Sequence, residues 1–193
     1  MTDREPPDSG MRPRMPQAQT LSEWRIEQIE IRLNNELKDL RAHIDRCMVE
    51  TRKYLDKLGR TLDPYQQTRV GQMAIAIESG NLWLRGAADL VKAYAPTFAG
   101  DANTSNEQAD KLVAYANMVR TAIEQTCMDV IQLCERCVGT RGLLPPIPME
   151  RIIRDLTLYL RQPAFDAAIA NVGQYALSES SSAHSLWSYE SDN

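Results

Sequence analysis

Apolar side chains recur at three- and four-residue steps over long parts of the chain, starting with a run from Leu21 to Leu58 that contains neither proline nor glycine. This spacing places the apolar residues on one face of a helix. At 1.5 Å per residue the run predicts one helix about 55 Å long. Gly59 follows as a helix stop, and Asp63-Pro64 supplies a cap and a first-turn proline for the next helix.

A second run with the same period extends to Tyr94 and ends at Pro96. It contains Gly71, Gly80 and Gly86, each of which costs about 1 kcal/mol of helix propensity relative to alanine. We therefore expect a neighbouring element to pack closely against the second helix at these positions.

The same apolar periodicity predicts three further helices. A third long helix is predicted to end near Cys137, a shorter fourth one to begin at Pro148 and to be broken by Pro163, and a fifth to run toward Leu177. No segment alternates with period two, so no sheet is predicted. The fold class is all-α, a bundle of three long and two short helices with antiparallel neighbours.

The two ends of the chain differ in composition from the predicted bundle, which covers residues 21–177. Residues 1–20 hold four of the ten prolines, and residues 178–193 are rich in serine. Neither segment has the apolar period that would offset the entropy cost of ordering, so both are expected to be disordered tails. Trp187 and Tyr189 either stay free or dock as an anchor, and the polar composition around them favours the first interpretation.

Charge and hydropathy limit the partners of the protein. The net charge is −4, the isoelectric point is about 5.3 and no block of Lys and Arg occurs, which argues against a general nucleic-acid binder. No apolar run approaches the roughly 20 residues that span a bilayer. We expect a cytoplasmic protein that binds neither nucleic acid nor membrane.

The cysteines and histidines do not form a recognisable metal or redox site. Cys134 and Cys137 make one CxxC inside a predicted helix, without a second CxxC, and His43 and His184 are too few to complete a zinc site. Cys127 shares a helical face with this pair, so the three are expected to be small buried side chains. No metal is predicted.

No catalytic residue is predicted either. No Ser-His-Asp or Cys-His arrangement can be assembled from the sequence. Carboxylates on the first helix lie among Arg and Lys, as an ion-paired and solvated helix face does. These include Glu27, Glu30, Asp39 and Asp45.

The stretch GTRGLLPPIPMERIIRD, which follows the third helix, is the exception to the plain helical pattern. Its first four residues, Gly139, Thr140, Arg141 and Gly142, could point backbone amides at an anion, with the arginine beside it. The alternative is a helix stop followed by a proline-rich crossover, which the glycine and proline content favours. The later Arg154-Asp155 pair could equally be a simple ion pair.

This stretch and the order of helices from about residue 62 to 172 resemble the C-terminal helical domain of the acyl-CoA dehydrogenase family and of related flavin monooxygenases. There a glycine-containing turn follows a long helix, and an Arg-Asp pair lies in the next short helix. The resemblance implies that the turn approaches the FAD of a neighbouring subunit. It makes cofactor-binding candidates of Gly139, Thr140, Arg141, Gly142, Arg154 and Asp155.

The sequence also departs from that family. The family commonly has a glutamate after the Arg-Asp pair, whereas this chain has Arg161-Gln162-Pro163-Ala164. An Arg-x-x-Phe-Gly segment is not evident before Gln66-Gln67, and the family's other domains have no counterpart here. We therefore expect a non-catalytic assembly module or subunit that binds no cofactor tightly by itself. The alternative is an FAD-binding subunit of an acyl-CoA dehydrogenase-type oxidoreductase, active only with a partner.

An oligomer is expected because the helix of residues 21–58 is longer than a compact bundle of this chain could cover. An uncovered apolar stripe usually binds another subunit. The expected occupant is a second copy or a partner flavoprotein subunit, and Leu40 is expected to belong to the interface.

Overall fold

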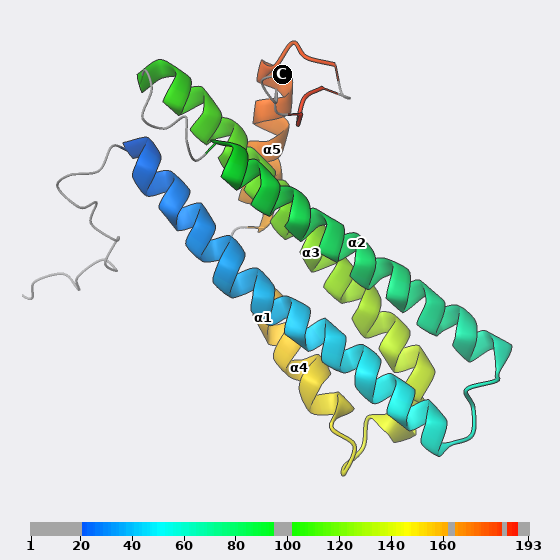
Figure 1. The fold of residues 1–193 in the computed structure, drawn as a ribbon. Coiled ribbons are helices and arrows are strands. Elements are labelled where there is room, and N and C mark those ends of the chain that lie inside the picture. Colours follow the sequence, from blue (N-terminus) through cyan, green and yellow to red (C-terminus); the bar gives the residue numbers. More distant parts are fainter. Residues whose placement is uncertain (1–20, 95–101, 162–164, 183–184, 189–193) are drawn as a thin grey trace, which may run out of the picture.

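The computed structural model describes residues 21–94, 102–161, 165–182 and 185–188 (Figure 1). These residues form five helices and no strand. The helices are α1 (Leu21–Lys57), α2 (Pro64–Tyr94), α3 (Ala102–Gly142), α4 (Met149–Leu160) and α5 (Phe165–Ser178). The predicted all-α bundle of three long and two short helices is confirmed.

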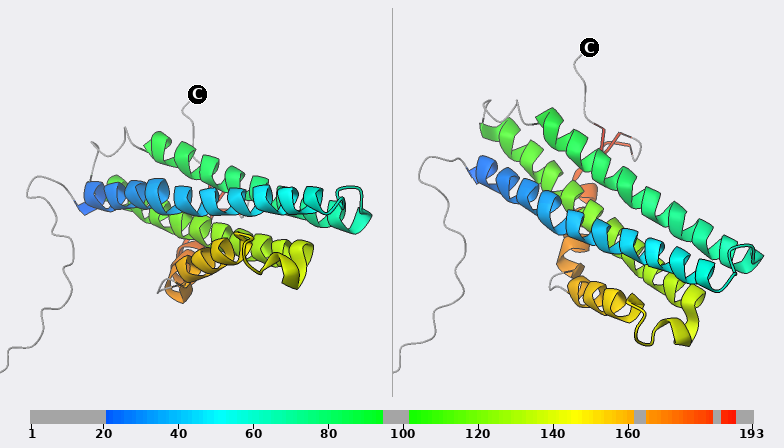
Figure 2. Two further views of the ribbon diagram at one scale, coloured as in Figure 1. Left: turned by 90° about the horizontal axis from the view of Figure 1, so that it is seen from below. Right: turned by 60° about the horizontal axis from the view of Figure 1, so that its bottom comes forward.

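The three long helices lie side by side, and α3 packs against both α1 and α2 (Figures 1 and 2). The short α4 packs on α1 and α3 near the end of the bundle where α1 turns into α2. The last helix, α5, crosses α3 steeply and packs on it closer to the opposite end. The chain therefore places α3 at the centre, in contact with every other helix.

The connection between α1 and α2 is made by the residues that the sequence indicated. Gly59 has φ 64° and follows the end of α1, where Arg60 N donates to Leu55 O at 2.9 Å. Asp63 Oδ1 accepts from Tyr65 N at 2.9 Å and so caps the first turn of α2. The predicted stop and cap are both confirmed.

The end of α3 differs from the prediction. The helix continues past Cys137 to Gly142, although Gly139 inside it has φ 59° and ψ −175°. This dihedral pair breaks the helix, and only glycine adopts it without strain. Thr140 starts a further turn, with its carbonyl accepting from Leu143 N at 3.2 Å. A glycine stop signal was therefore read correctly at Gly139, but the chain resumes a helical turn after it.

Several apolar side chains that the structure describes on α1 are covered by the chain itself. Leu40, Ile44 and Cys47 are 6%, 2% and 0% exposed and belong to the main core with residues of α3 and α4. Nearer the start of α1, Ile29 is buried in a second cluster with Leu90 of α2. The expectation that Leu40 lies on an uncovered stripe is wrong, because α3 and α4 shield this part of α1.

Two of the three glycines in α2 have the expected close neighbours. A Cβ at Gly86 would lie 2.6 Å from the Tyr115 hydroxyl oxygen, and one at Gly80 would lie 3.2 Å from Ile123 Cδ1. At Gly71 no atom lies within 4 Å. Close packing is thus confirmed at two positions and wrong at the third, which faces open space.

Replacing Gly71 by alanine is expected to raise the free energy of unfolding by about 0.5–1 kcal/mol, because the methyl group meets nothing and the unfolded chain loses freedom. Urea denaturation followed by circular dichroism measures the change. Gly86→Ala is the matched control on the same helix and should not stabilise, since its methyl group displaces Tyr115. Equal stabilisation by both changes would contradict the packing described for Gly86.

Candidate functional site

The end of the bundle where the α1–α2 connection meets the C-terminal end of α3 is held together by polar side chains. Arg69 Nη1 donates to Arg136 O at 3.0 Å, which ties α2 to the last turns of α3. Gln66 is only 2% exposed. With its amide oxygen turned toward the two arginines, it accepts from Arg60 Nη2 at 3.0 Å and Arg69 Nη1 at 3.2 Å. We call this region the loop end.

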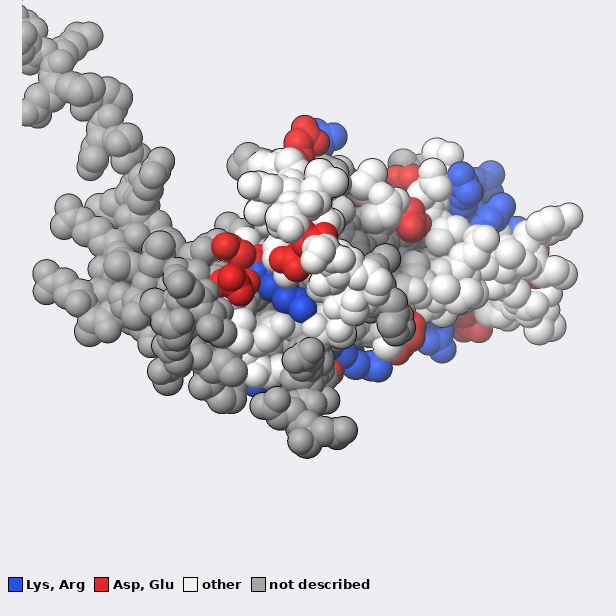
Figure 3. All heavy atoms as spheres, turned by 90° about the horizontal axis from the view of Figure 1, so that it is seen from above, with Lys and Arg blue, Asp and Glu red and all other residues white. Residues whose placement is uncertain are grey.

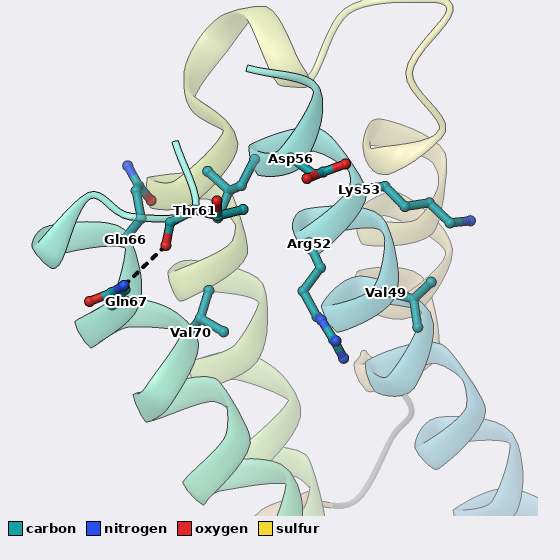
Figure 4. Close-up of a pocket in the computed structure, with 9 residues that line it drawn as sticks. Val49, Arg52, Lys53, Asp56, Thr61, Gln66, Gln67 and Val70 are labelled. Atoms are coloured by element: carbon teal, nitrogen blue, oxygen red, sulfur yellow. Dashed lines mark hydrogen bonds between the residues drawn. The ribbon is translucent and has the colours of Figure 1, made fainter. Parts of the chain in front are cut away.

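A groove of about 520 Å³ opens between α1 and α2 at the loop end (Figure 4). Its lining combines apolar and polar side chains from both helices. They include Val49, Leu55 and Val70 together with Arg52, Gln66 and Gln67. Such a lining suits a ligand that has two parts. One part is apolar, and the other is either an anion or a group that forms hydrogen bonds with side-chain amides.

Arg52 is the cation best placed to meet such a ligand. In Figure 4 its side chain extends into the space between α1 and α2, whereas Lys53 is turned away from α2. Lys53 Nζ also pairs with Glu50 Oε1 at 2.8 Å. Within the described residues Arg52 has no ion pair, so its guanidinium remains available to an anion.

The four residues of the glycine turn have different surroundings. Gly139 is exposed, with no atom within 4 Å of a Cβ placed on it, and Thr140 and Arg141 are exposed as well. Gly142 is buried, and a Cβ there would collide with Val138 and approach Tyr54 Cζ at 3.3 Å. Its small size is therefore required by packing inside the chain.

The Arg-Asp pair lies on α4, which begins at Met149, one residue after the predicted Pro148. Arg154 Nε lies 3.9 Å from Asp155 Oδ1, and Arg154 Nη1 lies 3.1 Å from Glu150 Oε1. Asp155 Oδ2 lies 3.6 Å from Arg151 Nε. These groups are partly exposed, so the interpretation as surface ion pairs is confirmed for the residues concerned.

The six cofactor-binding candidates therefore occupy two separate places. Among the described residues, no hydrogen bond or ion pair joins 139–142 to Arg154 or Asp155. Asp155 instead lines a small cavity of about 260 Å³ between α4 and α1, together with His43, Arg46 and Arg151. Only the glycine turn belongs to the loop end.

A family model described as acyl-CoA dehydrogenase, C-terminal domain, matches residues 43–161. The chain belongs to this family. The match begins within α1 and ends just after α4, so it contains both the glycine turn and the Arg-Asp pair. No curated protein and no solved structure matches the chain in the parallel comparisons.

FAD is the cofactor that membership of the acyl-CoA dehydrogenase family implies, and the glycine turn fits it only in part. Open backbone at Gly139 with the exposed Arg141 beside it suits one phosphate group. Gly142 offers no such approach, because Val138 and Tyr54 occupy the space in front of it. The turn fits a contact with the edge of a dinucleotide and does not enclose one.

The sequence did not single out Arg52 or place Gln66 in a site. A signal for Arg52 was present, since this basic residue lies on the last turns of α1, close to the predicted stop at Gly59. The sequence could not show which face of α1 meets α2, and that face decides whether Arg52 reaches the groove.

The four cysteines are all free and buried. Cys134 Sγ lies 2.9 Å from Thr51 Oγ1 and 3.1 Å from Met149 Sδ. Burial, with a smaller effect of the Glu124 charge, raises the pKa of Cys127 to about 12. Burial likewise raises the pKa of Cys137 to about 11. These two thiols stay protonated near neutral pH, and the interpretation of the α3 cysteines as core side chains is confirmed.

Within the described part of the chain, no group of three or more His, Cys, Asp or Glu residues is placed to hold a metal ion. The same residues contain no helix that is both long and apolar enough to cross a bilayer.

Replacing Cys134 by serine is expected to cost only about 1 kcal/mol of stability, because the hydroxyl keeps the hydrogen bond to Thr51. Cys134→Ala leaves the buried Thr51 hydroxyl without that partner and should cost more, about 1–3 kcal/mol. Urea denaturation measures both. Elemental analysis of the purified protein is expected to find no bound zinc, and stoichiometric zinc that disappears in Cys134→Ser would overturn the core interpretation.

Proposed function

We propose that this chain is a helical assembly module of the acyl-CoA dehydrogenase family, which contributes a binding surface to a complex and no catalytic base. The chemistry of the described residues supports this. His43 Nδ1 is hydrogen-bonded to Asp39 O at 2.7 Å, and Arg154 and Asp155 take part in exposed ion pairs. His43 and Asp155 both line the small cavity of about 260 Å³ between α4 and α1, but these contacts already engage His43 Nδ1 and both Asp155 carboxylate oxygens.

The connection between α4 and α5 gives further support. The family resemblance places a catalytic glutamate after the Arg-Asp pair, but the chain has Arg161-Gln162-Pro163-Ala164 there. Residues 162–164 lie outside the described residues, so the support comes from composition. None of these four side chains is a carboxylate that could take a proton from a substrate.

Two exposed apolar side chains of α2 are the observation that carries the assembly proposal. Ile75 and Leu82 are 70% and 58% exposed. They are seven residues apart, about two helical turns, and so lie on the same face. Leu62 and Tyr65, 84% and 77% exposed, add apolar surface at the loop end. Exposed apolar surface of this kind typically marks a protein interface, and we propose that a second copy of the chain covers it.

Light scattering after size exclusion tests the proposal at micromolar protein. The wild-type chain is expected to have a mass of at least twice 21.8 kDa, and a chain carrying Ile75→Asp and Leu82→Asp is expected to be a monomer with unchanged helicity. Leu177→Asp is the matched control, since Leu177 is 90% exposed at the end of α5. A strict wild-type monomer, or equal dissociation by the control, would refute this interface.

An FAD-binding subunit of an acyl-CoA dehydrogenase-type oxidoreductase is the second candidate. Two features favour it: the open backbone at Gly139, and Arg52 in the loop-end groove, which has no ion pair with another described residue. Calorimetric titration with FAD separates the two functions. For an assembly module we expect no saturable binding by the wild type. Tight binding that is lost in Arg141→Ala or Arg52→Ala, and kept in Arg85→Ala, would establish the second candidate instead.

A further inference from the structure

The segment Ser185–Ser188 returns to the bundle and places Trp187 between α3 and α5. The Trp187 ring centroid lies 5.8 Å from that of Tyr115 on α3 and 5.4 Å from that of Tyr175 on α5. Trp83 of α2 extends the cluster, with its centroid 6.4 Å from Tyr115. We call Trp83, Tyr115 and Tyr175 the aromatic shelf. Offset and edge-on aromatic pairs at these distances are favourable contacts beyond the area they bury.

A second contact fixes the backbone beside the tryptophan. Lys111 Nζ donates to Ser188 O at 2.7 Å, so a lysine of α3 holds the carbonyl one residue after Trp187. Aromatic stacking and this charged hydrogen bond act on adjacent residues. Together they define both the position and the direction of the segment on the shelf.

The serines of this segment build its turn. Ser182 O accepts from Ser185 N at 3.0 Å and from Leu186 N at 2.9 Å, and the hydroxyls of Ser182 and Ser185 lie 2.9 Å apart. Ser188 Oγ donates to Ser185 O at 2.7 Å. A locally hydrogen-bonded turn lowers the entropy cost of docking, so a short segment can bind with few contacts.

The helix α5 packs on α3 directly as well as through this segment. Ala168 is the one fully buried side chain among the described positions of α5. The side chains of Asn117 and Asn171 share a hydrogen bond of 2.9 Å. Ile169 and Leu177 are 45% and 90% exposed. Trp187 adds an aromatic bridge to this contact, because its ring meets Tyr115 of α3 and Tyr175 of α5.

The charges around the shelf do not make its stacking sensitive to pH. Burial is the main cause that raises the pKa of Tyr175 to about 12, and the carboxylates of Glu179, Asp110 and Glu107 add to it. Figure 3 looks onto the molecule from above, where acidic and basic side chains lie close together. Tyr175 stays a neutral phenol at physiological pH, so contact, rather than ionisation, governs docking.

We propose that Ser182 and Ser185–Ser188 form a detachable clasp, and that the aromatic shelf is a docking site for a tryptophan followed by a carbonyl within reach of Lys111. The occupant is the chain's own C-terminal segment. The clasp is closed when Trp187 stacks on Tyr115 and Tyr175, and α5 is then held on α3. When it opens, α5 loosens and the shelf is left free for the same segment to dock again. This inference does not depend on the proposed assembly function.

Hydrogen exchange of the full-length protein tests the closed state. In Trp187→Ala we expect the amides of α5 to exchange about tenfold faster or more, with α1 and α2 unchanged, because local opening sets these rates. Leu177→Ala is the control, since it removes an exposed side chain from the same helix. Unchanged exchange in α5 of Trp187→Ala would overturn the clasp.

A synthetic peptide of residues 182–193 tests the shelf as a docking site. It is expected to bind full-length Trp187→Ala, to restore protection of α5, and to bind the wild type at least about tenfold more weakly, because the tethered segment competes at high effective concentration. The same peptide with alanine in place of the tryptophan should not bind. Equal affinity for both proteins would overturn the proposal. So would a wild-type dimer that becomes a monomer in Trp187→Ala, since the occupant would then be a second copy.

Discussion

Replacing Leu40 by aspartate is expected to unfold the bundle, with loss of most of the helical circular dichroism at temperatures where the wild type is folded. Leu40 is 6% exposed and packs in the main core. An aspartate there has no described partner and costs about 3–5 kcal/mol, as an unpaired buried charge does. Native domains are stable by only about 5–15 kcal/mol, so one such change removes much of the margin. Thermal and urea denaturation measure the loss.

Leu177→Asp is the matched control for Leu40→Asp. Leu177 is 90% exposed on α5, so an aspartate there keeps its hydration and should change stability by no more than about 0.5 kcal/mol. A Leu40→Asp protein that stays fully folded and only changes its oligomeric state would show that α1 is less covered than the fold implies.

Leu156→Ala is expected to cost about 2–5 kcal/mol, because it leaves a cavity where α4 packs into the main core. Leu156 is 0% exposed and shares that core with Met149, Ile152 and residues of α1 and α3. The loss should begin locally, with faster hydrogen exchange in α4. Urea denaturation gives the global value.

Leu158→Ala, two residues further along the same helix, removes the same atoms from a side chain that is 62% exposed. Its cost should be about 0.5 kcal/mol or less. If both leucines proved equally costly, the orientation of α4 described above would be wrong.

The helices could be predicted because the periodic apolar runs are long and because the residues that start and end each helix act locally. Gly59 and the Asp63-Pro64 step act within one or two residues, so the end of α1 and the start of α2 follow from the sequence. The covering of Leu40 and the open space at Gly71 depend instead on which helix lies opposite. A periodic pattern predicts that one face of a helix is buried, but it does not indicate which other helix packs against that face.

The candidate site was predictable only as far as local chemistry reaches. Glycine at 139 was predicted as a helix stop, and an ion pair was one of the two interpretations of Arg154-Asp155, because both features depend on adjacent residues. The sequence spacing could not show that Gly142 must be small to fit against Val138 and Tyr54, since Tyr54 comes from a different helix. The interpretation of Trp187 as an unattached aromatic was wrong for the same reason, because its partners lie on α3 and α5. Tyr189 lies outside the described residues.

The central position of α3 has a consequence for how the chain is made. Each of the other four helices packs on α3, and α3 is complete only at Gly142. During synthesis α1 and α2 leave the ribosome before α3, so their shared partner is whole only after residue 142 has been translated. Until then their apolar faces lack most of their cover. The nascent chain therefore presents a long-lived target for chaperones, and slowing translation ahead of α3 should increase aggregation more than slowing it afterwards.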